Sequence, residues 1–389
     1  MVGSRSRWLR WIAPGLVALG AVGVVASSTL GAGVRQWAPS ACLGPPTDRT
    51  VAARDRRATA LGDMRGSPWF RLDPVLDRTA ALSGQRLALG LQGERSGRTL
   101  DLPSEAFAAG PFGGIVLIGS DDGSTSRLRA FDVARGCAWA FADERDVIRR
   151  ATIDRDGTAI YEMRVDRATR ADLGVWRRPI DGTAAARQVL GPPPADPRFG
   201  RTFSTEFVWD VAGSGRLAVQ SCGEVACRVR VVAPGGGGTA TLENPDLGPI
   251  LGLAGDFVVT YEACRGFPCP IVSTDLRDGS RRVLAPAAGL AVMIPTPDGS
   301  RVVHETTTPE GRGLSGIAPD GGAVDELGLI PDELRLHPGA TRADAATIVP
   351  PGWVVLAPDG RLPIDPTTSR VLLRHVPDGS TVALDEALR

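Results

Sequence analysis

Four of the six cysteines occur in two copies of one spacing, the clearest chemical pattern in this chain. Cys222 and Cys227 enclose GEVA, and Cys264 and Cys269 enclose RGFP, so the copies lie 42 residues apart. We expect each pair to form a local disulfide across a strand connection. Two alternatives stay open: a four-cysteine zinc site and a redox-active pair, although such pairs prefer C-x-x-C beside a helix N-terminus.

The other two cysteines, Cys42 and Cys137, complete an even number, which fits an oxidising compartment. A disulfide between them would hold the N-terminal segment against the rest of the chain. All six cysteines are therefore predicted to be disulfide-bonded.

The three histidines, His304, His337 and His375, lack the spacings that bind zinc on a helix, and we expect them to have structural or surface roles. No catalytic, cofactor-binding or metal-binding residue is assigned by motif, and no cofactor is expected.

Three glycine-containing motifs are interpreted as turns. GSDDG at 119–123 is not the G-x-S-x-G of a nucleophile elbow. DRDG at 154–157 begins like a calcium loop but lacks the distal glutamate. Four glycines at 235–238 lack the following helix N-terminus that a phosphate site needs.

The elements that would position these residues are short strands. Residues 151–190 contain four apolar runs punctuated by Asp156-Gly157 and Asp181-Gly182. Asp-Gly between short alternating segments favours hairpins, because glycine adopts the positive φ that tight turns need. Four antiparallel strands in about 40 residues are typical of one β-propeller blade.

This pattern recurs along the chain. Asp-Gly occurs eight times, with spacings of roughly 20 and 40 residues. No long segment of helical periodicity interrupts it, so the fold class is all-β. We predict a β-propeller of six or seven four-stranded blades over residues 68–389, with a pair of β-sandwiches as the alternative.

The N-terminus predicts a membrane-spanning helix before the propeller. Residues 1–10 form a basic, cytoplasmic segment with three arginines, and residues 11–34 are uncharged. As a helix, those 24 residues would span about 36 Å, enough to cross a bilayer. We favour an uncleaved signal-anchor over a cleaved signal peptide, with residues 35–67 as a juxtamembrane tether. The propeller would then be extracytoplasmic in a single-pass membrane protein, or secreted after cleavage.

Some segments resemble the repeat of TolB-type, WD-repeat-like bacterial propellers. They are IDRDGTAIYE at 153–162, WRRPIDG at 176–182 and MIPTPDGSRVVHE at 293–305. The resemblance extends over about residues 110–385 at the level of repeats, although AGSGR at 212–216 departs from it. It implies a binding platform in the cell envelope.

Composition narrows the function further. Positive and negative residues balance at 44 each, and every basic residue is arginine. This balance removes the electrostatic argument for nucleic-acid binding. We therefore predict a monomeric, non-catalytic binding or scaffold module with an envelope protein or glycan as its partner. The alternative is a propeller hydrolase or lyase with a carboxylate or calcium site in the central channel.

Overall fold

The computed structural model describes residues 35–36, 40–42, 61, 65, 68–76, 78–79, 81–91, 97–112, 114–141, 143–154, 156–199, 201–244, 246–264, 266–337, 349–358 and 371–387. The predicted basic segment and membrane-spanning helix, residues 1–34, lie outside these residues. Among the residues that are described, no helix is long and apolar enough to cross a membrane.

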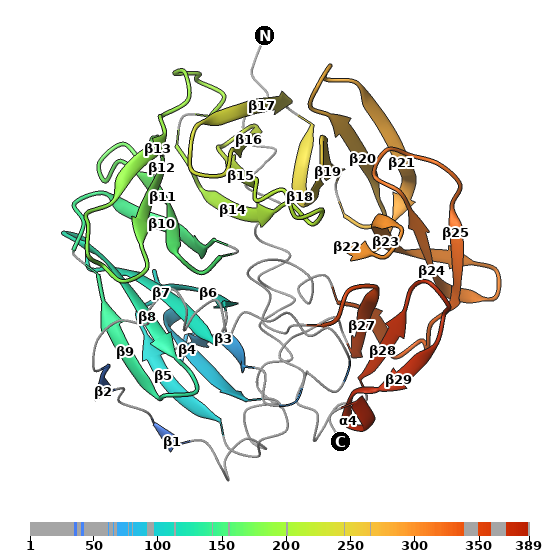
Figure 1. The fold of residues 1–389 in the computed structure, drawn as a ribbon, viewed down its shortest axis with the longest axis horizontal. Coiled ribbons are helices and arrows are strands. Elements are labelled where there is room, and N and C mark those ends of the chain that lie inside the picture. Colours follow the sequence, from blue (N-terminus) through green and yellow to red (C-terminus); the bar gives the residue numbers. More distant parts are fainter. Residues whose placement is uncertain are drawn as a thin grey trace.

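The described strands form seven sheets, placed around a common axis as the blades of a β-propeller (Figure 1). Blade 1 consists of β3 (Pro68–Leu76), β4 (Leu82–Leu91) and β5 (Arg98–Leu102), with β1 (Arg35–Gln36) at its edge. Blade 2 consists of β6 (Phe107–Phe112), β7 (Ile115–Asp121), β8 (Ser126–Asp132) and β9 (Cys137–Ala140), with β2 (Ser40–Ala41) at its edge. Blade 3 consists of β10 (Val147–Ile153), β11 (Ala159–Val165), β12 (Asp172–Pro179) and β13 (Arg187–Leu190).

The remaining four blades each take four consecutive strands. Blade 4 consists of β14 (Ser204–Trp209), β15 (Leu217–Cys222), β16 (Cys227–Val232) and β17 (Gly238–Asn244). Blade 5 consists of β18 (Leu247–Ala254), β19 (Phe257–Glu262), β20 (Cys269–Asp275) and β21 (Arg281–Ala288). Blade 6 consists of β22 (Ala291–Thr296), β23 (Gly299–Thr308), β24 (Gly311–Ile317) and β25 (Asp325–Leu329). Blade 7 consists of β26 (Leu334–Leu336), β27 (Trp353–Pro358), β28 (Leu372–His375) and β29 (Thr381–Ala383), followed by α4 (Leu384–Ala387).

The all-β prediction is confirmed, and the number of sheets is seven. The segment at 151–190 is blade 3, with antiparallel register throughout. Its turns at Gly157 and Gly182 have φ of 71° and 69°, which glycine adopts without steric strain. All of β11 is buried, because neighbouring sheets cover both of its faces.

The core is divided among the spaces between blades. One cluster joins Leu117 and Leu128 of blade 2 to Ile153 and Ile160 of blade 3. Similar clusters join each later pair of neighbouring blades as far as blade 7. Each blade therefore depends on its neighbours to bury its apolar side chains.

Buried polar side chains also join neighbouring blades. The amide of Gln220 on β15 donates to the Gly248 carbonyl at 2.8 Å and accepts the Ile250 N–H at 3.1 Å, both on β18. The Glu305 carboxylate on β23 accepts the Leu336 N–H of β26 at 2.8 Å. These bonds satisfy backbone groups at the inner strands, where the ladder does not reach them.

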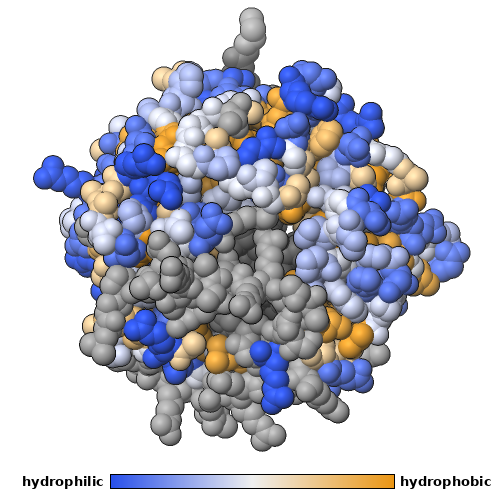
Figure 2. Space-filling view, in the orientation of Figure 1, coloured by the Kyte–Doolittle hydropathy of each residue, from blue (hydrophilic) through white to orange (hydrophobic). Residues whose placement is uncertain are grey.

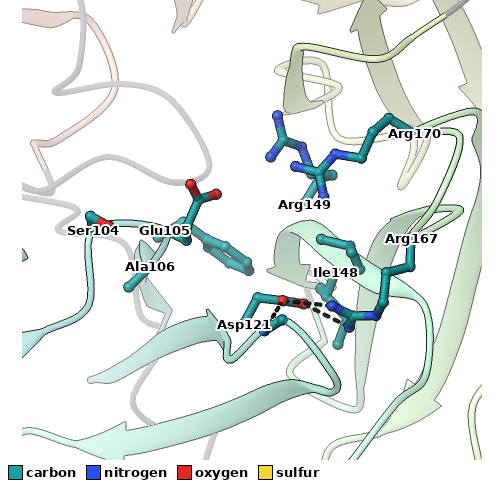
Figure 3. A pocket seen from close by; sticks show the side chains of 11 residues that line it. Ser104, Glu105, Ala106, Asp121, Ile148, Arg149, Arg167 and Arg170 are labelled. Carbon is teal, nitrogen blue, oxygen red and sulfur yellow. Dashed lines mark hydrogen bonds and ion pairs between the residues drawn. The ribbon is translucent and has the colours of Figure 1, made fainter.

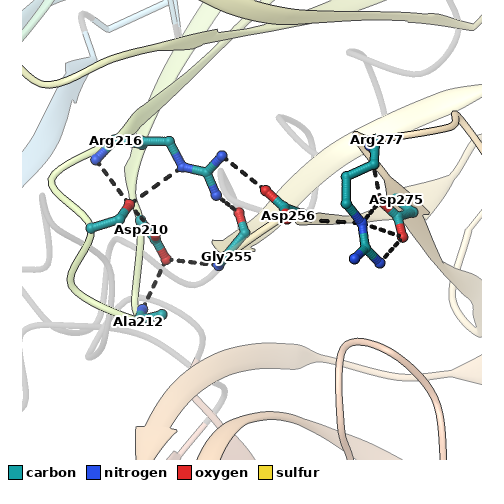
Figure 4. A network of polar contacts seen from close by, with 8 residues as sticks. Asp210, Ala212, Arg216, Gly255, Asp256, Asp275 and Arg277 are labelled. Carbon is teal, nitrogen blue, oxygen red and sulfur yellow. Dashed lines mark hydrogen bonds and ion pairs between the residues drawn. The ribbon is translucent and has the colours of Figure 1, made fainter.

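The two ends of the propeller axis have different connections. At one end, which we call the turn mouth, lie the hairpins between first and second strands and between third and fourth strands. At the other end, the pocket mouth, lie the hairpins between second and third strands and the connections between blades. Figure 4 shows a polar network at the turn mouth, where Arg216 of blade 4 contacts Gly255 and Asp256 of blade 5.

Two short strands lie in residues 35–67, the segment for which a juxtamembrane tether is predicted. Both β1 and β2 pair in parallel with outer strands, β5 and β9 respectively. The Cys42–Cys137 disulfide fastens this segment to blade 2. Among the described strands, no sheet combines strands from both ends of the chain.

The surface of the ring is largely hydrophilic on the face shown in Figure 2, with apolar residues scattered between polar ones. A polar pocket is therefore a stronger candidate for a functional site than an apolar patch on this face.

Candidate functional site: an arginine-lined pocket between blades 2 and 3

A pocket of about 620 Å³ opens at the pocket mouth, where blade 2 meets blade 3 (Figure 3). Its charged lining comprises Arg149, Arg167, Arg170, Asp121 and Glu105, and its apolar lining includes Phe107 and Ile148. These residues come from the starts of β6 and β10, the β7–β8 hairpin and the β11–β12 turn. Two adjacent blades thus contribute opposite walls.

Asp121 and Arg167 form a bidentate ion pair across the boundary between the blades. Arg167 Nη1 and Nη2 lie 2.7 and 2.8 Å from the two carboxylate oxygens of Asp121. Ser126 and the Gly123 N–H also donate to this carboxylate. Burial favours a higher pKa for Asp121, but these hydrogen bonds together lower it. The carboxylate is therefore ionised near neutral pH and cannot donate a proton, and its oxygens already accept hydrogen bonds from Arg167, Ser126 and Gly123.

Arg149 has a half-buried guanidinium whose charge is poorly compensated. One of its nitrogens donates to the Phe203 carbonyl at 2.7 Å. The pKa of Arg149 is lowered, chiefly by burial and also by repulsion from Arg170, while Glu105 and Asp121 act in the opposite direction. Two nearby positive charges favour the approach of an anion.

Arg170 has an unusual backbone conformation at the pocket. Its φ is 63°, and no other non-glycine residue in the described ranges has a positive φ. Its N–H donates to the Asp166 carbonyl four residues earlier. Three other turns have the same bond from a positive-φ glycine: Gly136 to Asp132, Gly279 to Asp275 and Gly379 to His375. Arginine thus occupies a position where the equivalent turns have glycine.

The opposite wall carries Glu105 and Phe107. Glu105 is exposed, and within the described part of the chain its carboxylate has no hydrogen bond or ion pair. Phe107 is half-buried and pairs across the sheet with Gly119. A Cβ at position 119 would overlap the Phe107 ring, so glycine is needed there for the ring to lie against the backbone. This ring and Ile148 give the pocket an apolar surface.

The six cysteines form the three disulfides expected from the sequence: Cys42–Cys137, Cys222–Cys227 and Cys264–Cys269. The last two close the hairpins between second and third strands in blades 4 and 5, so they occupy equivalent positions at the pocket mouth. The first of these hairpins also supports the pocket, because the Cys222 carbonyl accepts the Phe203 N–H at 2.8 Å.

The histidines lie away from this pocket, in blades 6 and 7. His304 is buried in β23, where burial lowers its pKa. His337 follows β26 and is buried, and His375 in β28 contacts Asp378 at 2.9 Å. Each has a position compatible with the structural role expected for it.

The glycine motifs form the expected turns, but one of them has a further role. Asp156 and Gly157 lie between β10 and β11, and Gly235–Gly237 lie between β16 and β17. In the motif at 119–123, the first three residues end β7 and the last two begin its turn to β8; Asp121 lines the pocket. Sequence reasoning did not identify the pocket, because its arginines and Glu105 belong to no motif.

A second group of charged residues lies buried between blades 2 and 3. Arg164 contacts Glu144 at 2.8 Å and Glu162 at 2.7 Å, and Arg178 contacts the same two carboxylates. Two arginines therefore neutralise both carboxylates, which favours a structural role. Among the described residues, no group of three or more His, Cys, Asp or Glu side chains could hold a metal ion.

Comparison with known proteins supports the fold. No protein-family model matches the chain, and no curated protein sequence matches it. The chain is similar to the solved structures of a prolyl endopeptidase (13% identity, 97% of this chain and 55% of that chain, TM-score 0.50) and a puromycin hydrolase (14% identity, 90% and 57%, TM-score 0.50). It is also similar to TolB from Acinetobacter baumannii (12% identity, 67% and 66%, TM-score 0.41).

These similarities show the β-propeller fold alone. The chain spans just over half the length of the two enzymes and about two thirds of TolB. The likeness to TolB is too weak to add an argument about function.

Proposed function

We propose that this chain is an extracytoplasmic, non-catalytic binding propeller that holds an envelope partner, a protein or a glycan, at its pocket mouth. The pocket between blades 2 and 3 carries this proposal. Its arginines remain protonated and are suited to hydrogen-bonding an anionic group. Its partly buried carboxylate, Asp121, is already bound by Arg167.

The disulfides support the location. Three disulfides form and persist in an oxidising environment. We propose that residues 11–34 anchor the propeller to the membrane or direct its secretion, as their uncharged sequence predicts.

Site-specific crosslinking tests the binding role. Ala168 at the pocket mouth and Ala184 at the turn mouth are both exposed alanines of blade 3. Each is replaced in turn by benzoylphenylalanine, and the protein is irradiated in native envelopes. We expect a defined crosslinked product from position 168 and none from position 184. Equal yields from both positions, or no product from either, would contradict the proposal.

The alternative is an enzyme with a carboxylate or calcium site in the central channel. The two enzymes to which the chain is similar motivate it, although both are nearly twice as long as the shared region. Elemental analysis distinguishes the two functions, because stoichiometric calcium that survives dialysis would favour the enzyme.

A further inference from the structure

The pocket between blades 2 and 3 presents opposite charges on its two walls. Figure 3 shows Glu105 on one side and Arg149 and Arg170 on the other. Within the described residues, neither the Glu105 carboxylate nor the Arg170 guanidinium has a hydrogen bond or ion pair. Both groups are therefore available to a ligand.

These charges do not neutralise each other. Glu105 is close enough to raise the pKa of Arg149, yet no ion pair joins them. Asp121 is paired with Arg167, so its negative charge does not also neutralise the positive charges of Arg149 and Arg170. The pocket retains a separated anionic side and cationic side.

On the cationic side, Arg170 adopts a backbone conformation that favours glycine. Arg170 has a φ of 63°, where glycine stands in the equivalent turns at 136, 279 and 379. Such conformations often occur at binding sites, where a side chain must be presented in a fixed position. The Arg170 carbonyl also accepts the Thr202 N–H at 2.9 Å, which fixes the turn from the next blade.

Apolar side chains form the smaller part of the pocket lining. Phe107 packs on Gly119, and Ile148 is 5% exposed. The volume of about 620 Å³ is larger than a single amino acid needs and is within the range of small-ligand pockets.

We propose that this pocket binds a short peptide with two free termini, as a zwitterion. Arg149 and Arg170 would bind its carboxylate, Glu105 would bind its ammonium group, and an apolar side chain would contact Phe107. This inference rests on the proposed binding function and specifies its ligand. A polyanionic glycan fits less well, because three arginines facing two carboxylates leave a single net positive charge and further anionic groups would meet Glu105.

Equilibrium dialysis with mass spectrometry tests the inference. The purified full chain is dialysed against three pools of tripeptides Ala-X-Leu, where X is varied. One pool has free termini, one is N-acetylated and one is C-amidated. We expect retention from the free pool, and about tenfold weaker binding from each blocked pool because one charge-assisted contact is lost.

Variants that remove one charge from the pocket show which residue binds which end of the peptide. In Glu105→Gln, acetylation should no longer weaken binding, whereas amidation should. In Arg170→Gln, amidation should weaken binding less than in the wild type, because only Arg149 still binds the carboxylate, whereas acetylation should weaken binding as much as in the wild type. Arg187→Gln, an exposed arginine on β13, should behave as wild type. A residue with a purely structural role would weaken binding of all three pools equally, which would overturn the assignment.

Three further outcomes test the ligand class and separate the inference from the proposed function. Retention of a galacturonate trisaccharide and of no tripeptide would overturn the peptide class. If no tripeptide is retained while position 168 still gives a crosslink, the peptide inference fails and the binding role stands. If position 168 gives no crosslink but the tripeptides bind as expected, the inference about the pocket stands and the envelope-partner role fails.

Discussion

Arg167 in the β11–β12 turn binds both carboxylate oxygens of Asp121 at the end of β7, joining blade 3 to blade 2 beside the pocket. Because both side chains are partly shielded from water, we expect a double-mutant cycle of Asp121→Asn and Arg167→Gln to give a coupling free energy of about 1–2 kcal/mol. Urea unfolding measures it. The exposed pair Arg86–Asp101 is the control, with an expected coupling of no more than about 0.5 kcal/mol. Equal couplings would contradict the prediction.

The same carboxylate predicts a dependence of stability on pH. The pKa of Asp121 is lowered in the folded protein, where Arg167, Ser126 and Gly123 donate to it. Its contribution is therefore complete above the unfolded value of about 3.9 and is lost as the pH falls through the lower, folded value. Urea unfolding between neutral pH and pH 3 should show that Asp121→Asn loses less stability than wild type over this acid range. Parallel curves would show that Asp121 is not linked to folding.

Much of the fold could be predicted from the sequence because its turns have a distinctive composition. Six of the eight Asp-Gly pairs lie in turns that connect first to second or third to fourth strands. All six therefore lie at the turn mouth. The pocket lies at the other mouth, where the hairpins have more varied sequences, so the pattern that identified the fold does not locate the site.

The pocket itself could not be predicted, because its residues meet only through the packing of two blades. Glu105 and Arg170 are 65 positions apart and share no motif. One signal was present in the sequence: Asp166 begins a turn like those at Asp132 and Asp275, but arginine stands where those turns end in glycine. Its meaning depends on the turn geometry, which only the structure supplies.

The Gln220 side chain links blade 4 to blade 5 and should contribute to the stability of the folded protein. Its side chain is 2% exposed and satisfies both the Gly248 carbonyl and the Ile250 N–H. Gln220→Ala would leave both backbone groups buried without a partner, so we expect a loss of about 2–3 kcal/mol in the free energy of unfolding. Gln188→Ala is the matched control, because Gln188 is exposed and makes one bond, to the Leu173 carbonyl; a change within about 0.5 kcal/mol is expected. A small effect at Gln220 would mean that water replaces its hydrogen bonds.

Removal of either short disulfide should lower the stability by a similar amount, but the two removals should affect peptide binding differently. Cys222–Cys227 and Cys264–Cys269 have the same sequence separation of 5. Replacing either pair by serine should therefore cost a similar amount, about 2 kcal/mol. Only the first pair adjoins Phe203, whose carbonyl accepts the hydrogen bond from Arg149. Retention of free-terminus tripeptides should fall more in Cys222→Ser/Cys227→Ser than in the other variant; equal losses would show that the hairpin does not support the pocket.

Substitutions of Arg170 separate the effect of its backbone conformation on stability from the effect of its guanidinium on binding. Arg170→Gly removes the steric cost of φ 63° but makes the unfolded chain more flexible, so we expect a free energy of unfolding that is unchanged or higher by up to about 1 kcal/mol. Arg170→Ala keeps a Cβ at the same φ and should be less stable than the glycine variant. Both variants lack the Arg170 guanidinium and keep Arg149, so both should show a smaller preference for free over amidated tripeptides than the wild type. Urea unfolding and dialysis on the same samples measure the two effects. A glycine variant that is less stable than the alanine variant would show that the turn imposes no strain on arginine, and that the guanidinium is not held there against a backbone preference.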